Sequence, residues 1–165
     1  PQPLVYFAMG SSGNRDLVLD VLTGLGRADC QVLAPVRSHL RQEDLETLPR
    51  NVHVTDWLPA HQLGDAVDLA ITHGGEGTVQ TSCVQGWPFI GIPLQLEQRF
   101  NVQRCVAFGS ARLVSQREAR RTDWAELVRQ ALADEGMRSR ARRMAGLMEG
   151  LDGPGRAAEA ICELL

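Results

Sequence analysis

The strongest constraint on the fold of this chain is a repeated alternation of short apolar runs with longer segments of helical periodicity. The apolar runs lie at residues 4–9, 31–36, 52–54, 69–72, 88–94 and 111–114. Because their apolar residues are largely consecutive rather than alternating, these runs are typical of strands that are buried on both faces. The alternation predicts an α/β fold: a doubly wound, mostly parallel six-stranded sheet, flanked by helices and joined by right-handed crossovers.

The segments between the runs predict the flanking helices. They cover residues 15–25, 61–66, 78–85, 97–108, a stretch that begins after Thr122, 137–149 and 156–165. Asn14 and Thr122 are expected N-caps, because their side-chain oxygens can accept a hydrogen bond from the first helical turn. The helix at 97–108 is expected to turn Val102, Cys105 and Val106 inward. The final segment carries an apolar stripe of Ala157, Ala158, Ile161, Leu164 and Leu165.

Size and charge narrow the class of protein. A chain of 165 residues with 44% hydrophobic and 22% charged residues is typical of one globular domain. The net charge of -3 disfavours nucleic acid as a partner, and no apolar run approaches the roughly 20 residues of a membrane span. The arginines between residues 112 and 143 are therefore predicted to form a solvated helical face. The chain begins at Pro1 without a signal peptide, so we expect a piece of a cytoplasmic protein.

Two residue types exclude specific chemistries. Lysine is absent, which excludes a Walker lysine and a pyridoxal-phosphate anchor. Cysteines stand at positions 30, 83, 105 and 162, each in an apolar context and without a Cys-x-x-Cys pair. We therefore expect reduced cysteines that pack as small hydrophobic residues, rather than a zinc site or disulfides.

Candidate site residues follow four of the predicted strands. They are Ser11 and Ser12 after the first strand, Trp57 after the third, His73 after the fourth, and Glu97 and Gln98 after the fifth. Open parallel sheets bind ligands beyond the carboxyl ends of their strands. The sequence therefore predicts that these four connections meet at one ligand site.

The connection after the fourth strand has the composition of an anion site. His73 is followed by Gly74-Gly75-Glu76-Gly77-Thr78 and then by a predicted helix. A helix N-terminus offers unpaired N–H groups and a partial positive charge, and glycines let a ligand approach the backbone. The dinucleotide fingerprint is not present, because no third glycine follows Gly75 and Gly77 at the required spacing. Our hypothesis is that this turn holds the diphosphate of a sugar nucleotide.

The other candidate residues leave alternatives open. Trp57 is either a core residue or a flat platform on which a nucleobase stacks. Glu97 and Gln98 are either ordinary residues of a first helical turn or readers of vicinal sugar hydroxyls. Ser11 and Ser12 are either turn residues or donors to a phosphate.

Several motifs together resemble a known family over essentially the whole chain. The motifs are Asp56-Trp57-Leu58-Pro59, His73-Gly74-Gly75-Glu76-Gly77-Thr78, Gly86-Trp87-Pro88, Pro93, Glu97-Gln98 and Asn101. In this combination the chain resembles the C-terminal, donor-binding half of a GT-B glycosyltransferase of the UDP-glycosyltransferase superfamily. The likeness is nearest to bacterial enzymes that glycosylate macrolides and other natural products.

The resemblance implies a role for each site residue. It implies Trp57 and Leu58 at the base; Ser11, Ser12, His73, Gly75, Gly77 and Thr78 at the diphosphate; Thr81 near the ribose; and Glu97 and Gln98 at the sugar. It also implies a UDP- or dTDP-sugar donor, a small-molecule acceptor and no metal or other cofactor. The catalytic base, a histidine, is expected in an N-terminal acceptor-binding domain outside this chain, to which the last helix would cross. None of the chain's own histidines, His39, His53, His61 and His73, matches that position.

Two positions depart from the family pattern. Many members have a glutamate that contacts the ribose hydroxyls where this chain has Thr81, which suggests a deoxyribose donor such as a dTDP-sugar. The family usually has aspartate at the position of Glu97. We expect an inverting transferase as the full-length protein and no transfer by this chain alone. The alternatives are another GT-B sugar-nucleotide enzyme, such as a lipid-linked glycosyltransferase or an epimerase, and a non-catalytic nucleotide-binding module.

Overall fold

The computed structural model describes residues 2–164 of the chain; Pro1 and Leu165 lie outside the described part. Its centre is a six-stranded sheet in which every strand pair is parallel, in the order β3-β2-β1-β4-β5-β6. The strands are β1 (Leu4–Ala8), β2 (Gln31–Ala34), β3 (Val52–Val54), β4 (Leu69–Thr72), β5 (Phe89–Gly91) and β6 (Ala111–Leu113). The predicted doubly wound α/β fold is confirmed.

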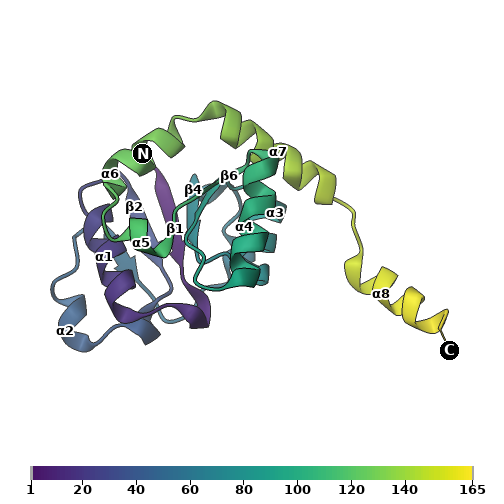
Figure 1. Cartoon of the computed structure of the whole chain (residues 1–165), viewed down its shortest axis with the longest axis horizontal. Helices are drawn as coiled ribbons and strands as arrows, with labels where there is room; N and C mark the ends of the chain where they lie inside the picture. The colour runs from purple at the N-terminus through teal and green to yellow at the C-terminus, as the bar shows by residue number, and fades with distance from the viewer. Residues whose placement is uncertain (1, 165) are drawn as a thin grey trace.

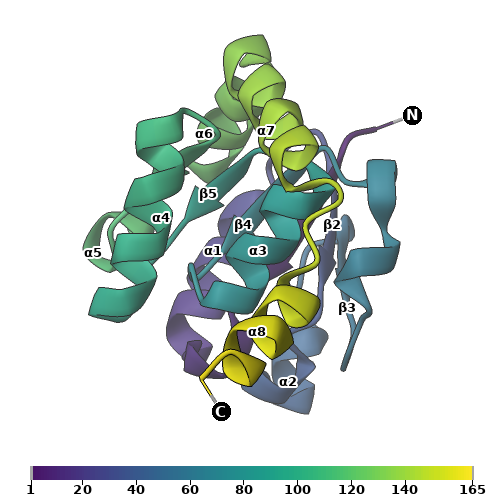
Figure 2. The same cartoon turned by 90° about the vertical axis from the view of Figure 1, so that its right-hand side faces the viewer.

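Among the described residues, eight α-helices and four 3₁₀ turns lie between the strands or follow the last one. The helices are α1 (Arg15–Leu25), α2 (Gln42–Leu45), α3 (Glu76–Gln85), α4 (Leu96–Phe108), α5 (Gln116–Ala119), α6 (Trp124–Leu132), α7 (Glu135–Met148) and α8 (Gly153–Cys162). The 3₁₀ turns are η1 (Gly10–Ser12), η2 (Arg37–His39), η3 (Ala60–Gln62) and η4 (Gly64–Ala66). The sheet lies between α1, α5 and α6 on one face and α3 and α4 on the other (Figure 1; Figure 2).

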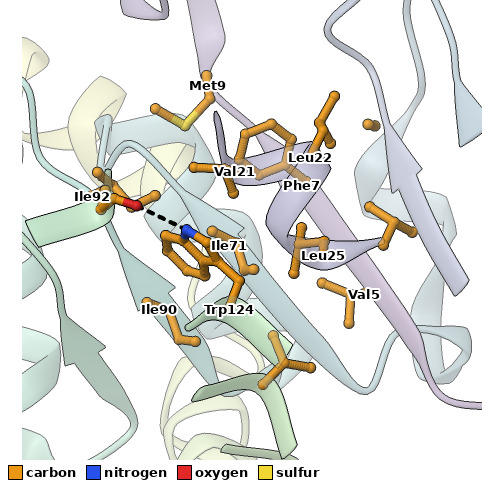
Figure 3. Close-up of a cluster of buried hydrophobic side chains, with 14 of the residues drawn as sticks. Val5, Phe7, Met9, Val21, Leu22, Leu25, Ile71, Ile90, Ile92 and Trp124 are labelled. Atoms are coloured by element: carbon orange, nitrogen blue, oxygen red, sulfur yellow. Dashed lines mark hydrogen bonds between the residues drawn. The ribbon is translucent and has the colours of Figure 1, made fainter. Parts of the chain in front are cut away.

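The strands are apolar throughout because both faces of the sheet are covered. Along β1 and its end, Val5, Phe7 and Met9 belong to the cluster under α1 and α6, whereas Tyr6 and Ala8 belong to the cluster under α3 and α4. Figure 3 shows the first cluster, in which Trp124 packs beside strands β4 and β5. The Trp124 indole Nε1 donates a hydrogen bond of 3.0 Å to the Ala119 carbonyl, so its polar atom is satisfied inside the core.

Local details at two helices differ from the sequence-based expectations. Thr122 is not the N-cap of α6: Asp123 holds that place and accepts from Glu126 N, while the Thr122 hydroxyl donates to the Glu118 carbonyl at the end of α5. Both side chains carry an oxygen that can cap a helix. Thr122 uses its hydroxyl at the end of α5, so the N-cap of α6 falls one residue later, at Asp123. Val106 was expected to point inward but is 38% exposed, because α4 buries a narrower face.

The last helix stands apart from the sheet. α8 has no buried residue and extends away from the rest of the chain (Figure 1). It begins at Gly153, three residues earlier than expected, because Asp152 caps it and Pro154 fits the first turn. Its predicted apolar stripe is exposed at Ala157, Ala158, Ile161 and Leu164; Leu165 lies outside the described residues.

The cysteines are free thiols, as expected, and three of them, Cys30, Cys83 and Cys105, are buried. Cys162 is exposed on α8, so the expectation of apolar packing is wrong for that residue. No helix within residues 2–164 has both the length and the apolarity of a membrane span.

Candidate functional site

The site forms where the sheet order changes direction. β1 and β4 are neighbours in register, with Ala8 opposite Thr72, and their connections lead to opposite faces of the sheet. The loop after β1 and the turn after β4 therefore emerge side by side. This is the position at which open parallel sheets bind ligands.

His73 is the central side chain of the site. A methyl group on Gly10 would lie 2.6 Å from the His73 Cε1 atom, and one on Gly75 would overlap Nε2. The Cε1–Nε2 edge of the imidazole ring thus lies close to both Gly10 and Gly75, and His73 is only 7% exposed. Gly10 has a φ of +53°, a conformation that glycine adopts without a steric cost. The absence of side chains at these two glycines explains why a histidine fits at the end of this strand.

The environment of His73 favours its neutral form. Burial lowers the pKa of the His73 imidazole and His39 adds to this effect, while the Ala8 carbonyl and the Glu97 carboxylate oppose it. The Nδ1 atom is buried and has no hydrogen-bond partner among the described residues. Because Nδ1 is shut off from solvent, a ligand atom can reach His73 only at the small part of the residue that is exposed.

The N-terminus of α3 adds free donors beside His73. The helix begins at Glu76, two residues earlier than expected, so Gly77 and Thr78 lie in its first turn. Its N-cap is Gly75, which makes no side-chain cap bond and leaves the first N–H groups of the helix uncapped. Space above Gly77 is open, since an added methyl group there would meet no atom within 4 Å. The turn therefore presents backbone donors to an open face.

The hydroxyl groups around this turn are paired internally. The Thr78 hydroxyl donates to the Gly75 carbonyl at 2.9 Å and accepts from the Thr72 hydroxyl at 2.8 Å. The Thr81 hydroxyl donates to the Gly77 carbonyl at 2.8 Å. In this arrangement Thr78 offers a ligand its backbone N–H rather than its hydroxyl proton.

Gln98 joins the loop after β1 to the start of α4. Its Nε2 atom donates to the Ser12 Oγ at 3.1 Å, and its Oε1 atom accepts from Leu94 N at 2.9 Å. The side chain is only 3% exposed, whereas the neighbouring Glu97 and Ser11 are exposed. Gln98 thus braces the site from within, and Glu97 and Ser11 face solvent.

Asn101 also lies at the site, although the sequence alone predicted no role for it. Its Nδ2 atom donates to the Glu97 Oε1 at 2.6 Å and to the Gly74 carbonyl at 3.1 Å. It therefore orients the Glu97 carboxylate and ties α4 to the turn after β4. The signal was present in the sequence, because Glu97 and Asn101 are four residues apart and share a helix face.

Trp57 lies beyond β3 with 76% of its surface exposed, so it is not a core residue. Leu58 is partly buried and packs on the cluster under α3 and α4. An exposed tryptophan anchored by its neighbour is a flat surface on which a nucleobase can stack.

His39 also reaches the site and was not predicted there. It ends the 3₁₀ turn η2 after β2, and its Nε2 atom lies 2.7 Å from the Gly10 carbonyl oxygen. A carbonyl oxygen only accepts, so Nε2 carries the proton and donates. The loop at Gly10 is thus contacted by two histidines from different strands.

The site is open rather than enclosed. A surface hollow of about 330 Å³ adjoins it, lined in part by Glu76, Gln80 and Asn101. Hollows of about 580 and 630 Å³ lie at α5 and α6, away from these strand ends. Among the described residues, no three His, Cys, Asp or Glu side chains lie together as a metal-binding group.

The chain is similar in sequence to a known domain family and to several known proteins. A family model described as "Erythromycin biosynthesis protein CIII-like, C-terminal domain" matches residues 19–164. A "PGL/p-HBAD biosynthesis glycosyltransferase" of Mycobacterium tuberculosis is 30% identical over 146 residues, which cover 87% of this chain and 33% of the relative. The oleandomycin glycosyltransferase of Streptomyces antibioticus is 34% identical over 122 residues, which cover 72% of this chain and 27% of the relative. The chain thus spans about a third of the length of the curated relatives it matches.

Solved structures share the fold. The glycosyltransferase of kitacinnamycin has a TM-score of 0.84 at 22% identity, with 99% of this chain and 43% of that chain covered. The glycosyltransferase VinC in complex with dTDP has a TM-score of 0.75 at 21% identity, with 91% of this chain and 38% of that chain covered. The match to these GT-B glycosyltransferases supports the fold class derived from the apolar runs.

Proposed function

This chain belongs to the family of the erythromycin biosynthesis protein CIII-like C-terminal domain, and we propose that it is the donor-binding half of an inverting glycosyltransferase. The full-length enzyme would transfer a hexose or deoxyhexose from a UDP- or dTDP-sugar to a hydroxyl of a small natural-product acceptor. An N-terminal domain would supply the acceptor pocket and the catalytic base. The two curated relatives support this proposal, since both are named glycosyltransferases.

The observation that carries the proposal is the pairing of His73 with the uncapped N-terminus of α3. His73 lies beside this turn with 7% of its surface exposed, and the first N–H groups of α3 are uncapped, with open space at Gly77. An anion placed here would receive several hydrogen bonds and the positive end of the helix dipole. A diphosphate has the charge and the number of oxygen atoms to use them all.

The diphosphate would be held by Gly75, Gly77 and Thr78 through their backbone N–H groups, by His73, and by Ser11. Ser12 would contribute through the loop that Gln98 braces. These donors stand in place before the ligand arrives, so they would stabilise the charge that develops on the departing nucleoside diphosphate. This stabilisation is the catalytic contribution that we assign to the chain; the deprotonation of the acceptor belongs to the missing base.

The nucleoside would lie beyond the diphosphate. Trp57, with Leu58 beneath it, would stack on the base, and Thr81 would lie near the ribose. The Thr81 hydroxyl is already paired with the Gly77 carbonyl, so it offers less to a ribose 2′-hydroxyl than a longer carboxylate would. We therefore propose a preference for a dTDP-sugar over a UDP-sugar.

The sugar would contact the start of α4. Glu97 is exposed and its carboxylate is oriented by Asn101. It would accept hydrogen bonds from the sugar hydroxyls, while Gln98 would hold the neighbouring loop and use its remaining N–H for the ligand. No metal or other cofactor is part of this proposal, because the N-terminus of α3 supplies the positive field and the neutral His73 ring supplies a hydrogen-bond donor.

Isothermal titration calorimetry of the chain with dTDP tests the diphosphate site. Replacing His73 by alanine should weaken dTDP about ten- to hundredfold, which is the range for a hydrogen bond to a charged group. The matched control is His53→Ala, since His53 lies on β3 and its ring bonds only Gln31 at 2.8 Å. Equal affinity of the wild type and the His73 variant for dTDP would refute the assignment.

Two further measurements separate the finer parts of the proposal. In a competition experiment the chain should bind dTDP more tightly than UDP. A strong preference for UDP would refute the dTDP preference that we infer from Thr81. Incubation of the chain with a nucleotide sugar and an alcohol acceptor should yield no glycoside. Measurable transfer would show that this chain holds the catalytic base after all.

A further inference from the structure

The loop between β1 and α1 is a small structure with few bonds of its own. η1 spans only Gly10–Ser12, no side chain caps it, and Gly10 takes a positive φ. Within the loop, Gly13 N donates to the Met9 carbonyl at 3.1 Å. A loop of this size is not held in one conformation by itself, so its position depends on contacts with other elements.

Three elements supply those contacts. From β4, the His73 ring lies against Gly10, and from α4, Gln98 donates to the Ser12 Oγ. From the end of β2, His39 donates from Nε2 to the Gly10 carbonyl at 2.7 Å. The same His39 nitrogen would lie 3.1 Å from a methyl group on Gly13, so the ring spans the loop from its first glycine to its last.

The His39 contact differs from the other two. His73 and Gln98 are nearly fully buried, whereas His39 is partly exposed and stands on a three-residue turn. It contacts the loop on a backbone carbonyl, so the hydrogen bond fixes the orientation of the peptide after Gly10. That peptide carries the N–H of Ser11, which the proposed function places at the diphosphate.

We infer that His39 is a positioning residue of the donor site, holding the Gly10 carbonyl so that the N–H groups and hydroxyls of Ser11 and Ser12 face the diphosphate. The inference rests on the proposed function. It assigns His39 no contact with the reacting atoms. Its effect is on the loop, and through the loop on the phosphate part of the nucleotide alone.

The side chain can be changed in a way that separates its hydrogen bond from its bulk. His39→Ala removes the donor, and His39→Gln restores an N–H donor on a side chain of similar reach. His53→Ala is the matched control, because it also removes a solvent-accessible histidine whose ring makes one hydrogen bond. Thermal unfolding of all variants checks that the chain is folded.

The binding experiment compares a nucleotide with its nucleoside. dTDP and thymidine are titrated into the wild type and the three variants, by calorimetry for dTDP and by NMR for the weaker thymidine. His39→Ala should weaken dTDP about three- to tenfold, as expected for one net hydrogen bond, and leave thymidine unchanged. His39→Gln should recover most of the dTDP affinity, and His53→Ala should match the wild type.

Hydrogen exchange of the free protein gives a second readout. The amides of residues 11–13 should exchange faster in His39→Ala than in the wild type or in His39→Gln. Unchanged dTDP affinity, or an equal loss for dTDP and thymidine, would overturn the inference while leaving the diphosphate site in place. Failure of the wild type to bind dTDP would overturn the proposed function and this inference together.

Discussion

Replacing Gly10 by alanine tests the geometry that places His73 in the site. The new methyl group would lie 2.6 Å from the His73 Cε1 atom, well inside van der Waals contact. The ring has little room to move away, because His73 is only 7% exposed. The substitution also puts a non-glycine residue at a φ of +53°. Two separate costs therefore combine at one position.

Gly64 provides a matched control for the backbone cost. It has a φ of +51°, and a methyl group there would meet nothing within 4 Å. Gly64→Ala should cost about 1–2 kcal/mol, the cost of a left-handed conformation for a residue with a Cβ. Gly10→Ala should add about 1–3 kcal/mol of overpacking, for a total of about 2–5 kcal/mol. Alanine also lowers the conformational entropy of the unfolded chain, and this effect is the same in the Gly10 and Gly64 variants.

Thermal unfolding measures the difference. At about 2–4 °C per kcal/mol for a chain of this size, Gly10→Ala should lower the Tm by about 4–20 °C and Gly64→Ala by about 2–8 °C. The double variant Gly10→Ala/His73→Ala should recover the overpacking cost but not the backbone cost, so the two substitutions should be non-additive. Equal Tm values for the two glycine variants, or full additivity in the double variant, would refute the placement of the ring.

Three other predictions follow from the burial of particular side chains. Trp57→Ala should weaken dTDP by about 1–3 kcal/mol with little change in Tm, because the indole is 76% exposed; a large drop in Tm with unchanged affinity would show a structural role. Burial lowers the pKa of His73, so below about pH 6.5 the unfolded chain binds more protons than the folded one. The free energy of unfolding should therefore fall between pH 7 and pH 5, and less steeply in His73→Gln; identical slopes in urea titrations would contradict this. A disulfide reagent such as Ellman's should label Cys162 rapidly and the buried Cys30, Cys83 and Cys105 only after unfolding. Since burial raises the pKa of Cys30 to about 11, that thiol should stay unreactive at pH 8, and rapid labelling of all the cysteines would contradict the packing.

The parts of the site that follow from neighbouring residues could be predicted from the sequence. The turn from His73 to Thr78 is a continuous strand–glycine–helix segment, so the anion-binding role that we propose for it depends only on local backbone geometry. The Asn14 cap of α1 was predicted correctly for the same reason, since it bonds the N–H three residues later. Such contacts are encoded by spacing along the chain.

Contacts between distant segments could not be predicted in this way. Ser12 and Gln98 are 86 residues apart, and His39 and Gly10 are 29 apart. Whether such pairs meet depends on the strand order and on the length of each connection. Likewise, a tryptophan after a strand is compatible with a core or a surface position, and only the packing of its neighbours left Trp57 exposed.

By itself the sequence determined the class of fold, because largely consecutive apolar runs require a sheet covered on both faces, and helical segments between them require parallel strands. It also determined where along the chain an anion could bind. The tertiary structure decided how the site is assembled: the placement of β1 beside β4 brings Gly10 against His73, and the end of β2 brings His39 to the same loop. The physical reason is that hydrogen bonds and ring packing act over a few ångströms, and only the folded sheet brings segments so distant in the chain within that range.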